Sequence, residues 1–245
     1  MGTRRARRVL ACLMLTLAPA CNRAEEADQL SSYCTKAIDT WSVYEPLGAR
    51  ELPEEERKAL VGQLAGRLVL LSTELSETAP RAARDDAEAL VDRYREVVKS
   101  RDSAGFTIQE LTSARSRLHE FDLENCKLTR IEVGGKDFAF EGLENTYRPN
   151  SYSFEFENAG AEAHEMVLLR KNDGVTEPFV DLLGMPREEL LQRVSQEGGA
   201  FADKGSSNFT LATLRPGDYA VACLIPAGDG EPHFKKGMLT EFLVS

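Results

Sequence analysis

The apolar residues of this chain change their spacing once, near Cys126, and this change constrains the fold more than any other feature. Before Cys126 they recur at helical spacing, and after it they alternate as in β-strands. The 245 residues are enough for two separate cores. The sequence therefore predicts an α+β multidomain protein, with a helical domain over residues 21–126 and a β domain over residues 127–245.

Four segments before Cys126 have the apolar pattern of amphipathic helices. Breaks at Pro46-Leu47-Gly48, Pro53, Pro80 and Gly105 separate them, and Thr107 and Glu110 have the spacing of a capping box for the last helix. Four helices with short connections predict an antiparallel four-helix bundle. The apolar positions are Leu30, Cys34, Ile38 and Trp41; Leu60, Leu64, Leu68, Leu71 and Leu75; Ala87, Leu90, Val91, Tyr94 and Val97; and Ile108, Leu111, Ala114, Leu118 and Phe121.

Seven short segments after Cys126 have strand-like alternation, with turn signals at Asn158-Ala159-Gly160 and Pro216-Gly217-Asp218. Strands of this number and length predict a β-sandwich. One helical insertion is expected over residues 186–194, followed by a stretch rich in Gly, Ser and Asp. The expected strands are 129–133, 137–140, 151–157, 166–169, 208–211, 219–223 and 239–244.

The first 20 residues have the three parts of an export signal. Four arginines precede an apolar run over residues 9–18, and small residues follow it directly before Cys21. A run of this length is too short to span a membrane. Residues 17–21 resemble a bacterial lipobox, which implies lipidation of Cys21 and a membrane anchor there. Ordinary cleavage after Ala20 is the alternative, and it leaves Cys21 as an unpaired thiol.

Removal of residues 1–20 leaves three cysteines besides Cys21, in a compartment where disulfides persist. In an up-down-up-down bundle, the start of the first helix and the end of the fourth lie at the same end. Cys34 and Cys126 have these two positions, so we expect them to form a disulfide. The alternative is that both are buried and unpaired. Cys223 is the cysteine left for another use.

Four residues of the β half form a ligand set that suits type 1 copper. Cys223 ends a strand, His233 and Met238 follow it before the last strand, and His164 enters an earlier strand. A thiolate and two imidazoles with a weak thioether ligand are the donors of blue copper sites. His119, the remaining histidine, lies on the fourth helix among charged neighbours, and we expect it to be a surface or half-buried residue.

On these residues the β half resembles a cupredoxin domain of the plastocyanin and azurin type. The resemblance implies a Greek-key β-sandwich with one type 1 copper site, in which His164, Cys223 and His233 are the planar ligands and Met238 is the axial ligand. Two positions depart from the pattern. Nine residues separate Cys223 from His233, and Glu165 follows the first histidine where plastocyanins have Asn.

The function implied by this resemblance is single-electron transfer by a copper protein. The export signal and the lipobox place it in the bacterial cell envelope, facing the periplasm or the outside. We expect no enzymatic activity, because the protein supplies all four ligands and leaves no open position for a substrate. The alternatives are copper capture or delivery, with the helical bundle as a docking module, and a metal-free sandwich that only binds proteins. Zinc is the competing metal at a Cys/His₂ site.

The chain is acidic, with a net charge of −10, or −14 without the four arginines of the leader. Nucleic acid and anionic lipid headgroups are therefore poor partners. A basic, cytochrome-like redox protein is the expected partner. We expect it to contact apolar residues around His233, namely Leu224, Ile225, Pro226 and Phe234.

Overall fold

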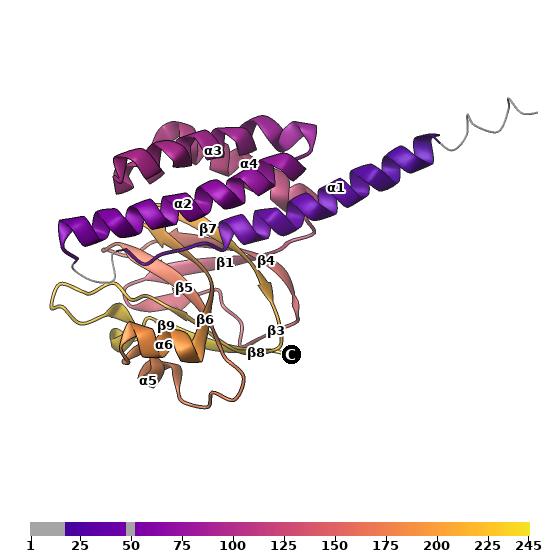
Figure 1. The fold of residues 1–245 in the computed structure, drawn as a ribbon. Helices are drawn as coiled ribbons and strands as arrows, with labels where there is room; N and C mark the ends of the chain where they lie inside the picture. The colour runs from indigo at the N-terminus through magenta and orange to yellow at the C-terminus, as the bar shows by residue number, and fades with distance from the viewer. Residues whose placement is uncertain (1–17, 48–51) are drawn as a thin grey trace, which may run out of the picture.

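The computed structural model describes the fold of residues 18–47 and 52–245, and the side chains from residue 25 onward within these ranges. The chain is α+β (Figure 1). Its helices are α1 (Ala18–Trp41), α2 (Glu54–Thr78), α3 (Arg81–Ser100), α4 (Gln109–Asn125), α5 (Phe179–Leu183) and α6 (Arg187–Arg193), with 3₁₀ helices at Ser103–Thr107 and His233–Lys236. Its strands are β1 (Thr129–Lys136), β2 (Ala139–Glu141), β3 (Thr146–Tyr147), β4 (Asn150–Asn158), β5 (His164–Lys171), β6 (Val194–Ala202), β7 (Ser207–Leu214), β8 (Gly217–Ala222) and β9 (Leu239–Val244).

The four long helices pack around a shared apolar core. Pro53 and Pro80 directly precede α2 and α3, where the fixed φ of proline suits a helix start. Three glutamates in the first turn of α2 complement the helix dipole. The capping box expected for α4 is wrong: Ile108 is the N-cap, and the Thr107 hydroxyl donates to the Ala104 carbonyl instead.

A disulfide joins Cys34 of α1 to Cys126 at the end of α4, with an S–S distance of 2.06 Å and a sequence separation of 92. Beside it, the rings of Tyr33 and Phe121 meet edge to face, with 5.4 Å between their centroids. These contacts connect the first and last of the four helices. Cys223 is a free, buried thiol.

The nine strands of the described residues form two sheets that pack face to face as a sandwich. One sheet has the order β2-β1-β4-β7 and the other β3-β9-β8-β5-β6. β1 runs parallel to β4, and β3 runs parallel to β9; the other pairs are antiparallel. The core between the sheets is aromatic and aliphatic, and its fully buried members include Phe154, Phe156, Leu168 and Tyr219.

β6 is a strand that the sequence pattern did not predict. It follows α6 directly and occupies the stretch rich in glycine, where Gly198 and Gly199 lower the intrinsic strand propensity. Pairing along the full length of β5 makes this stretch a strand, because the backbone of β5 would otherwise lack partners on that side.

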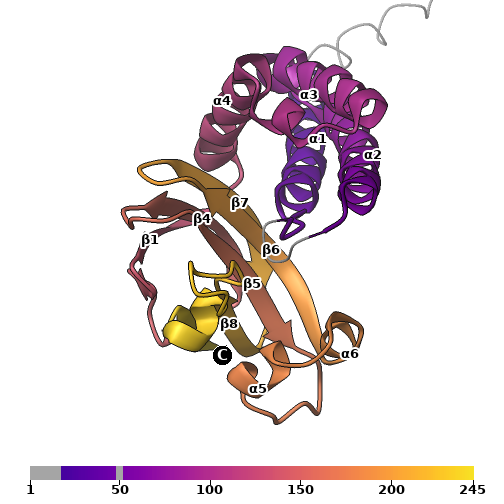
Figure 2. The same cartoon turned by 90° about the vertical axis from the view of Figure 1, so that its left-hand side faces the viewer.

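The four long helices, α1 to α4, lie over one side of the sandwich, next to β7 (Figure 2). Phe209 and Leu211 of β7 belong to the helical core, and the Thr210 hydroxyl donates to the Trp41 carbonyl at 2.8 Å. The two halves therefore share part of their apolar core.

His119 lies in this interface and is only 8% exposed, so its expected surface or half-buried position is wrong. Its ring stacks on Phe209, with 3.7 Å between the centroids. Its Nε2 atom lies 2.9 Å from the Ser153 hydroxyl and 3.1 Å from a Glu155 carboxylate oxygen. These contacts give His119 a structural role between the helices and β4.

The leader expected over residues 1–20 lies outside the described residues up to residue 17, and the side chain of Cys21 lies outside them too. Across the described part of the chain, no helix has both the length and the apolar character needed to cross a membrane.

Candidate metal centre

Two neighbouring strands bring the first histidine and the cysteine to the same end of the sandwich. His164 is the first residue of β5, and Cys223 directly follows β8. The two strands are antiparallel, with Val167 opposite Ala222. The start of β5 therefore lies beside the end of β8, although 58 residues separate the two segments.

His233 reaches the same place because the loop after Cys223 folds back on itself. The backbone N–H of Phe234 donates to the Cys223 carbonyl at 2.9 Å, and that of Cys223 donates to the Met238 carbonyl at 3.1 Å. The N–H of His233 donates to the Ile225 carbonyl at 2.9 Å, and that of Met238 to the His233 carbonyl at 3.0 Å. The long loop is therefore held by its own backbone around the cluster.

His164, Cys223 and His233 form one buried cluster whose ligand atoms all lie within 4.8 Å of one another. The two Nδ1 atoms are 3.1 Å apart, and Cys223 Sγ is 3.4 Å from Nδ1 of His233. The three side chains are at most 1% exposed. This arrangement directs one sulfur and one imidazole nitrogen of each histidine toward a common point.

The outer nitrogen of His233 is fixed by an acidic partner. Its Nε2 atom lies 3.1 Å from a carboxylate oxygen of Glu162, which favours the tautomer with the proton on Nε2. The lone pair of Nδ1 then faces the cluster. A histidine that donates its outer N–H to a carboxylate is typical of metal ligands.

The loop before His164 is fixed by Asn158, which is fully buried at the end of β4. Its Nδ2 atom donates to the carbonyls of Glu162 and Ala202 at 2.8 and 2.9 Å, and its Oδ1 atom accepts from the N–H of Gly160 at 2.9 Å. A Cβ atom on Gly160 would lie 2.4 Å from Nε2 of His164. The His164 ring thus fits only because residue 160 has no side chain.

Met238 is fully buried and follows the 3₁₀ helix that carries His233. Its methyl carbon lies close to the backbone of Gly135 in β1, where an added Cβ would be 3.3 Å away. The structure thus places Met238 within the sandwich at the end of the ligand loop, beside β1.

Glu165, the residue that departs from the plastocyanin pattern, is fully buried and connects three segments. Its backbone N–H donates to Cys223 Sγ at 3.4 Å, and its two carboxylate oxygens accept from the Leu224 N–H at 3.1 Å and from the Tyr44 hydroxyl at 2.5 Å. Burial raises the pKa of Glu165 to about 7, while the two hydrogen bonds oppose this rise. Sequence reasoning did not identify Tyr44.

The donor set fits a metal ion that prefers sulfur and imidazole. Burial raises the pKa of the Cys223 thiol to about 12, so without a bound cation the thiol stays protonated at neutral pH. Burial, followed by the nearby His233, lowers the pKa of His164, which keeps its imidazole neutral and able to bind a metal.

The apolar contact surface expected around His233 is wrong in part. Phe234 is only 5% exposed, because it packs in the core on the outer face of the five-stranded sheet. Leu224, Ile225 and Pro226 are partly exposed. Lys236 forms an ion pair with Asp229, which reduces its local positive field.

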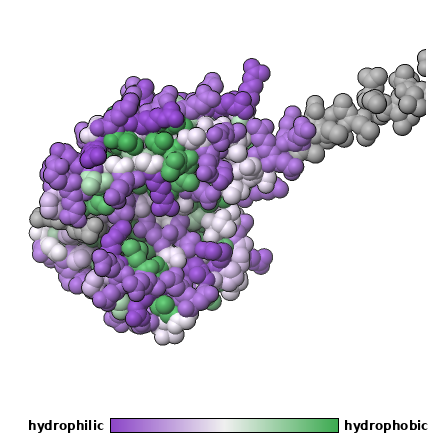
Figure 3. Space-filling model, viewed as in Figure 1, coloured by the Kyte–Doolittle hydropathy of each residue, from purple (hydrophilic) through white to green (hydrophobic). Residues whose placement is uncertain are grey.

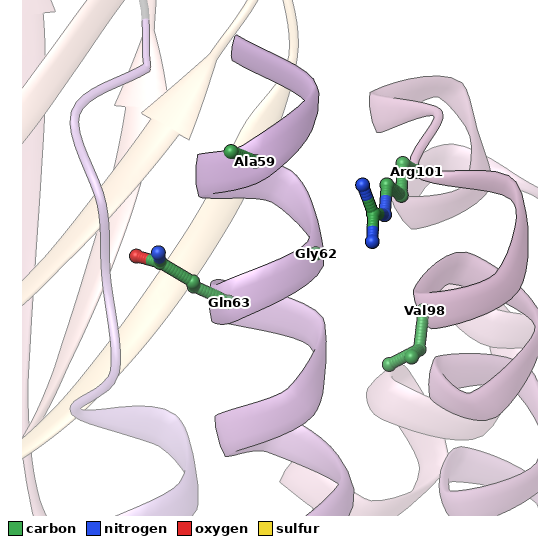
Figure 4. A pocket seen from close by; sticks show the side chains of 5 residues that line it. All are labelled: Ala59, Gly62, Gln63, Val98 and Arg101. Carbon is green, nitrogen blue, oxygen red and sulfur yellow. The ribbon is translucent and has the colours of Figure 1, made fainter. Parts of the chain in front are cut away.

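A hollow on the molecular surface lies between α2 and α3, in the helical half (Figure 4). None of the proposed metal ligands lines it. Gly62 faces the side chain of Arg101 there, and the remaining lining residues are Ala59, Gln63 and Val98. Arg101 is its one charged residue, and none of its lining residues is an acid or a histidine. Its lining therefore offers no group for acid–base chemistry.

No family model matches the chain, and the search of curated proteins found no match. Among solved structures, dithionite-reduced auracyanin from the photosynthetic bacterium Roseiflexus castenholzii is 19% identical and has a TM-score of 0.35, covering 48% of this chain and 97% of its own. Auracyanin A, a "blue" copper protein from the green thermophilic photosynthetic bacterium Chloroflexus aurantiacus, is 15% identical with a TM-score of 0.34, covering 48% and 98%.

The Cu-containing nitrite reductase (NirK) from Thermus scotoductus SA-01 is 14% identical with a TM-score of 0.31, and the match covers 52% of this chain and 33% of the reductase. The similarities fall on the C-terminal half, which contains the β-sandwich and the cluster of His164, Cys223 and His233.

Proposed function

We propose that the C-terminal half binds one copper ion in a type 1 site and carries single electrons. The observation that carries this proposal is the convergence of Cys223 Sγ with Nδ1 of both His164 and His233, all buried. His164, Cys223 and His233 would hold the ion, and Met238 would be the weak axial ligand. A bound copper ion supplies one-electron chemistry by alternating between Cu(I) and Cu(II).

The residues of this chain prepare the site in three ways. Glu162 fixes the ring of His233, the Glu165 N–H donates to the sulfur of Cys223, and Asn158 fixes the loop before His164. All of these groups lie within hydrogen-bonded segments, which would hold the donors in place around a bound ion. The Met238 thioether favours copper over zinc at this donor set.

A carrier fits the site better than an enzyme. Every proposed ligand is at most 1% exposed, so a substrate has no direct access to the donors. If Met238 is the fourth ligand, no coordination position remains for a reacting molecule.

The rest of the chain fits an exported, membrane-anchored carrier. We propose a signal over residues 1–20, lipidation of Cys21, and two modules over residues 21–126 and 127–245. The four helices of the first module would form an antiparallel bundle, supported by the disulfide between its first and last helices. The acidic surface supports a basic, cytochrome-like partner and no nucleic acid.

Visible absorption and electron paramagnetic resonance spectra of the copper-loaded chain test the function. An intense visible charge-transfer band from the copper–thiolate bond is expected for a type 1 site. The band should disappear on reduction and return on oxidation. Copper binding without such a band would favour capture or delivery, and no copper binding would favour a metal-free module.

A further inference from the structure

The side chain of Tyr44, in the helical half, contacts Glu165 beside the proposed metal centre. Tyr44 lies between α1 and α2, in a segment that Figure 2 shows descending toward the sandwich beside β6. Its hydroxyl donates to Glu165 at 2.5 Å across a sequence separation of 121 residues. Glu165 is the residue directly after the proposed ligand His164 and is fully buried.

Strand β6 contacts both the backbone and the ring of Tyr44. The side-chain amide of Gln196 donates to the Tyr44 carbonyl at 2.7 Å, which fixes the backbone of the segment. A Cβ atom on Gly199 would lie 2.4 Å from Cδ1 and 2.6 Å from Cγ of the Tyr44 ring. The ring therefore lies directly against the backbone of β6, and only glycine at residue 199 permits this approach.

Glu165 connects the Tyr44 ring to Leu224, the residue after Cys223, through hydrogen bonds. One carboxylate oxygen accepts from Tyr44 and the other accepts from the N–H of Leu224, the residue after Cys223. Both oxygens thus have protein donors, from two segments that are far apart in the sequence. Loss of one donor leaves a buried carboxyl group with an unmet hydrogen bond, which is costly in the protein interior.

We propose that Tyr44 is a positioning residue of the metal centre, through which the helical half holds Glu165 and the segment that carries Cys223. This inference rests on the proposed function only in treating Cys223 as a metal ligand. It assigns to the helical half a direct part in the geometry of the site, in addition to any role as a docking module.

The test compares Tyr44→Phe with Tyr152→Phe in the full, metal-free chain with its disulfide intact. Tyr152 is a matched control because its hydroxyl also donates one hydrogen bond, to the Arg148 carbonyl at 2.8 Å, near the start of β4. Asn158, which lies beside the cluster, is six residues further along that strand, or about 20 Å at the usual rise of a strand. Alkylation of the Cys223 thiol is followed by peptide mass spectrometry, and amide exchange is followed at Leu224.

Tyr44→Phe should increase the rate of Cys223 alkylation about fivefold, the change expected when one net hydrogen bond no longer opposes local opening. Amide exchange at Leu224 should accelerate by a similar factor, while Tyr152→Phe should leave both rates near the wild-type values. Equal rates in the two variants, or faster exchange spread evenly over the sandwich, would overturn the inference. If Tyr44→Phe is less stable overall, comparing amide exchange at Leu224 with exchange in the rest of the sandwich separates local from global opening.

A third variant tests whether Tyr44 acts through Glu165. In a Glu165→Leu background there is no carboxylate to accept from Tyr44, so Tyr44→Phe should cause no further increase in Cys223 alkylation. A full, additive increase would show that Tyr44 acts by another route and would contradict the inference.

The copper-loaded proteins provide an independent comparison. Transfer of Cu(I) from the protein to a chelator should be faster for Tyr44→Phe than for Tyr152→Phe. Wild-type protein that binds no copper would overturn the proposed function alone, because the alkylation and exchange comparisons use metal-free protein.

Discussion

Cys223 lies fully buried at the end of β8, where its sulfur accepts a hydrogen bond from the backbone of Glu165. A buried free cysteine usually behaves as a small apolar residue. Two imidazole nitrogens beside it distinguish this thiol from such a residue, because apolar neighbours would pack better against an inert sulfur.

Replacement of this sulfur should separate metal binding from folding. In Cys223→Ser we expect the intense visible band to be lost, because a hydroxyl cannot form the copper–thiolate bond. Serine is nearly isosteric, so the fold should persist with a free energy of unfolding lower by about 1 to 3 kcal/mol for the buried hydroxyl. Absorption spectra and urea denaturation measure the two effects. A band of full intensity in this variant would exclude Cys223 as the ligand.

The axial position should affect the potential more than the binding. Met238→Leu should retain copper and its blue colour, and its reduction potential should rise because loss of the weak thioether ligand favours Cu(I). Cyclic voltammetry of the wild-type and variant proteins measures the change. If Met238→Leu lost the visible band, as is expected of Cys223→Ser, the axial assignment would be wrong.

At this scale the sequence predicted the types of donor and their order along the chain. The structure joins Cys34 to Cys126 and brings the side chains of His164, Cys223 and His233 together, while the binding of copper by these residues stays a prediction. Tyr44 could not be predicted, because a contact across 121 residues depends on how the two halves pack and leaves no local pattern. The burial of His119 escaped prediction for the same reason.

Among the helices and strands, some were predicted from the sequence and others were not. Long periodic segments such as α2 and α3 were predicted because many apolar positions repeat along them. β6 was not predicted, since its glycines fit no apolar pattern and its strand conformation comes from pairing with β5. β3, with only two residues, is too short to show a period.

The disulfide between α1 and α4 should contribute strongly to the stability of the helical half. Replacing both Cys34 and Cys126 with Ala removes a covalent link across 92 residues, which should lower the free energy of unfolding by up to about 4 to 5 kcal/mol. Urea denaturation of the double variant and of the reduced wild-type protein should give similar losses.

Peptide mapping without reduction provides the chemical check on this pairing. It should recover Cys34 linked to Cys126 and Cys223 as a free thiol. A peptide in which Cys223 forms a disulfide with either one would remove the thiolate from the proposed copper site and contradict that assignment.

A buried acid between the helices should make stability depend on pH. Burial raises the pKa of Asp122 from its ordinary value of 3.8 to about 6, although the Trp41 indole donates to its carboxylate at 2.7 Å. The folded state therefore holds this proton more tightly, and its stabilising effect is complete below pH about 4 and is lost as the pH rises through about 6. The loss for this group is roughly 2 to 3 kcal/mol.

Asp122→Asn isolates this contribution, because the amide does not titrate and its oxygen can still accept from Trp41. Relative to wild type, the variant should become more stable between pH 4 and pH 7 by about 2 to 3 kcal/mol, as measured by urea denaturation at each pH. A stability difference that is constant across this range would contradict a raised pKa at Asp122.

At the scale of the whole molecule, each half carries a net charge of −7, counted over residues 21–126 and 127–245. The face in Figure 3 is largely hydrophilic, with apolar residues gathered over α2 and α3. These helices have exposed apolar side chains at Leu70 and Val98. The acidic field is therefore spread over the molecule, and no single half accounts for it.

This field should steer a basic partner. We expect the association rate with a basic cytochrome-like protein to fall as ionic strength rises, because the Debye length shrinks from about 30 Å at 0.01 M to about 8 Å at 0.15 M. Stopped-flow kinetics over this range measure the rate, and a neutral partner protein is the control. A rate that stays flat or rises would show that overall charge does not guide the encounter.

The order of the cysteines along the chain has a consequence for biosynthesis. In the proposed export route the chain enters the oxidising compartment from its N-terminus, so Cys34 and Cys126 arrive before Cys223, which lies 97 residues after Cys126. Because N-terminal domains generally fold first, the first two thiols can form their disulfide before the third thiol arrives. This order of entry would favour the pairing of Cys34 with Cys126 and would leave Cys223 as the free thiol that the proposed copper site needs.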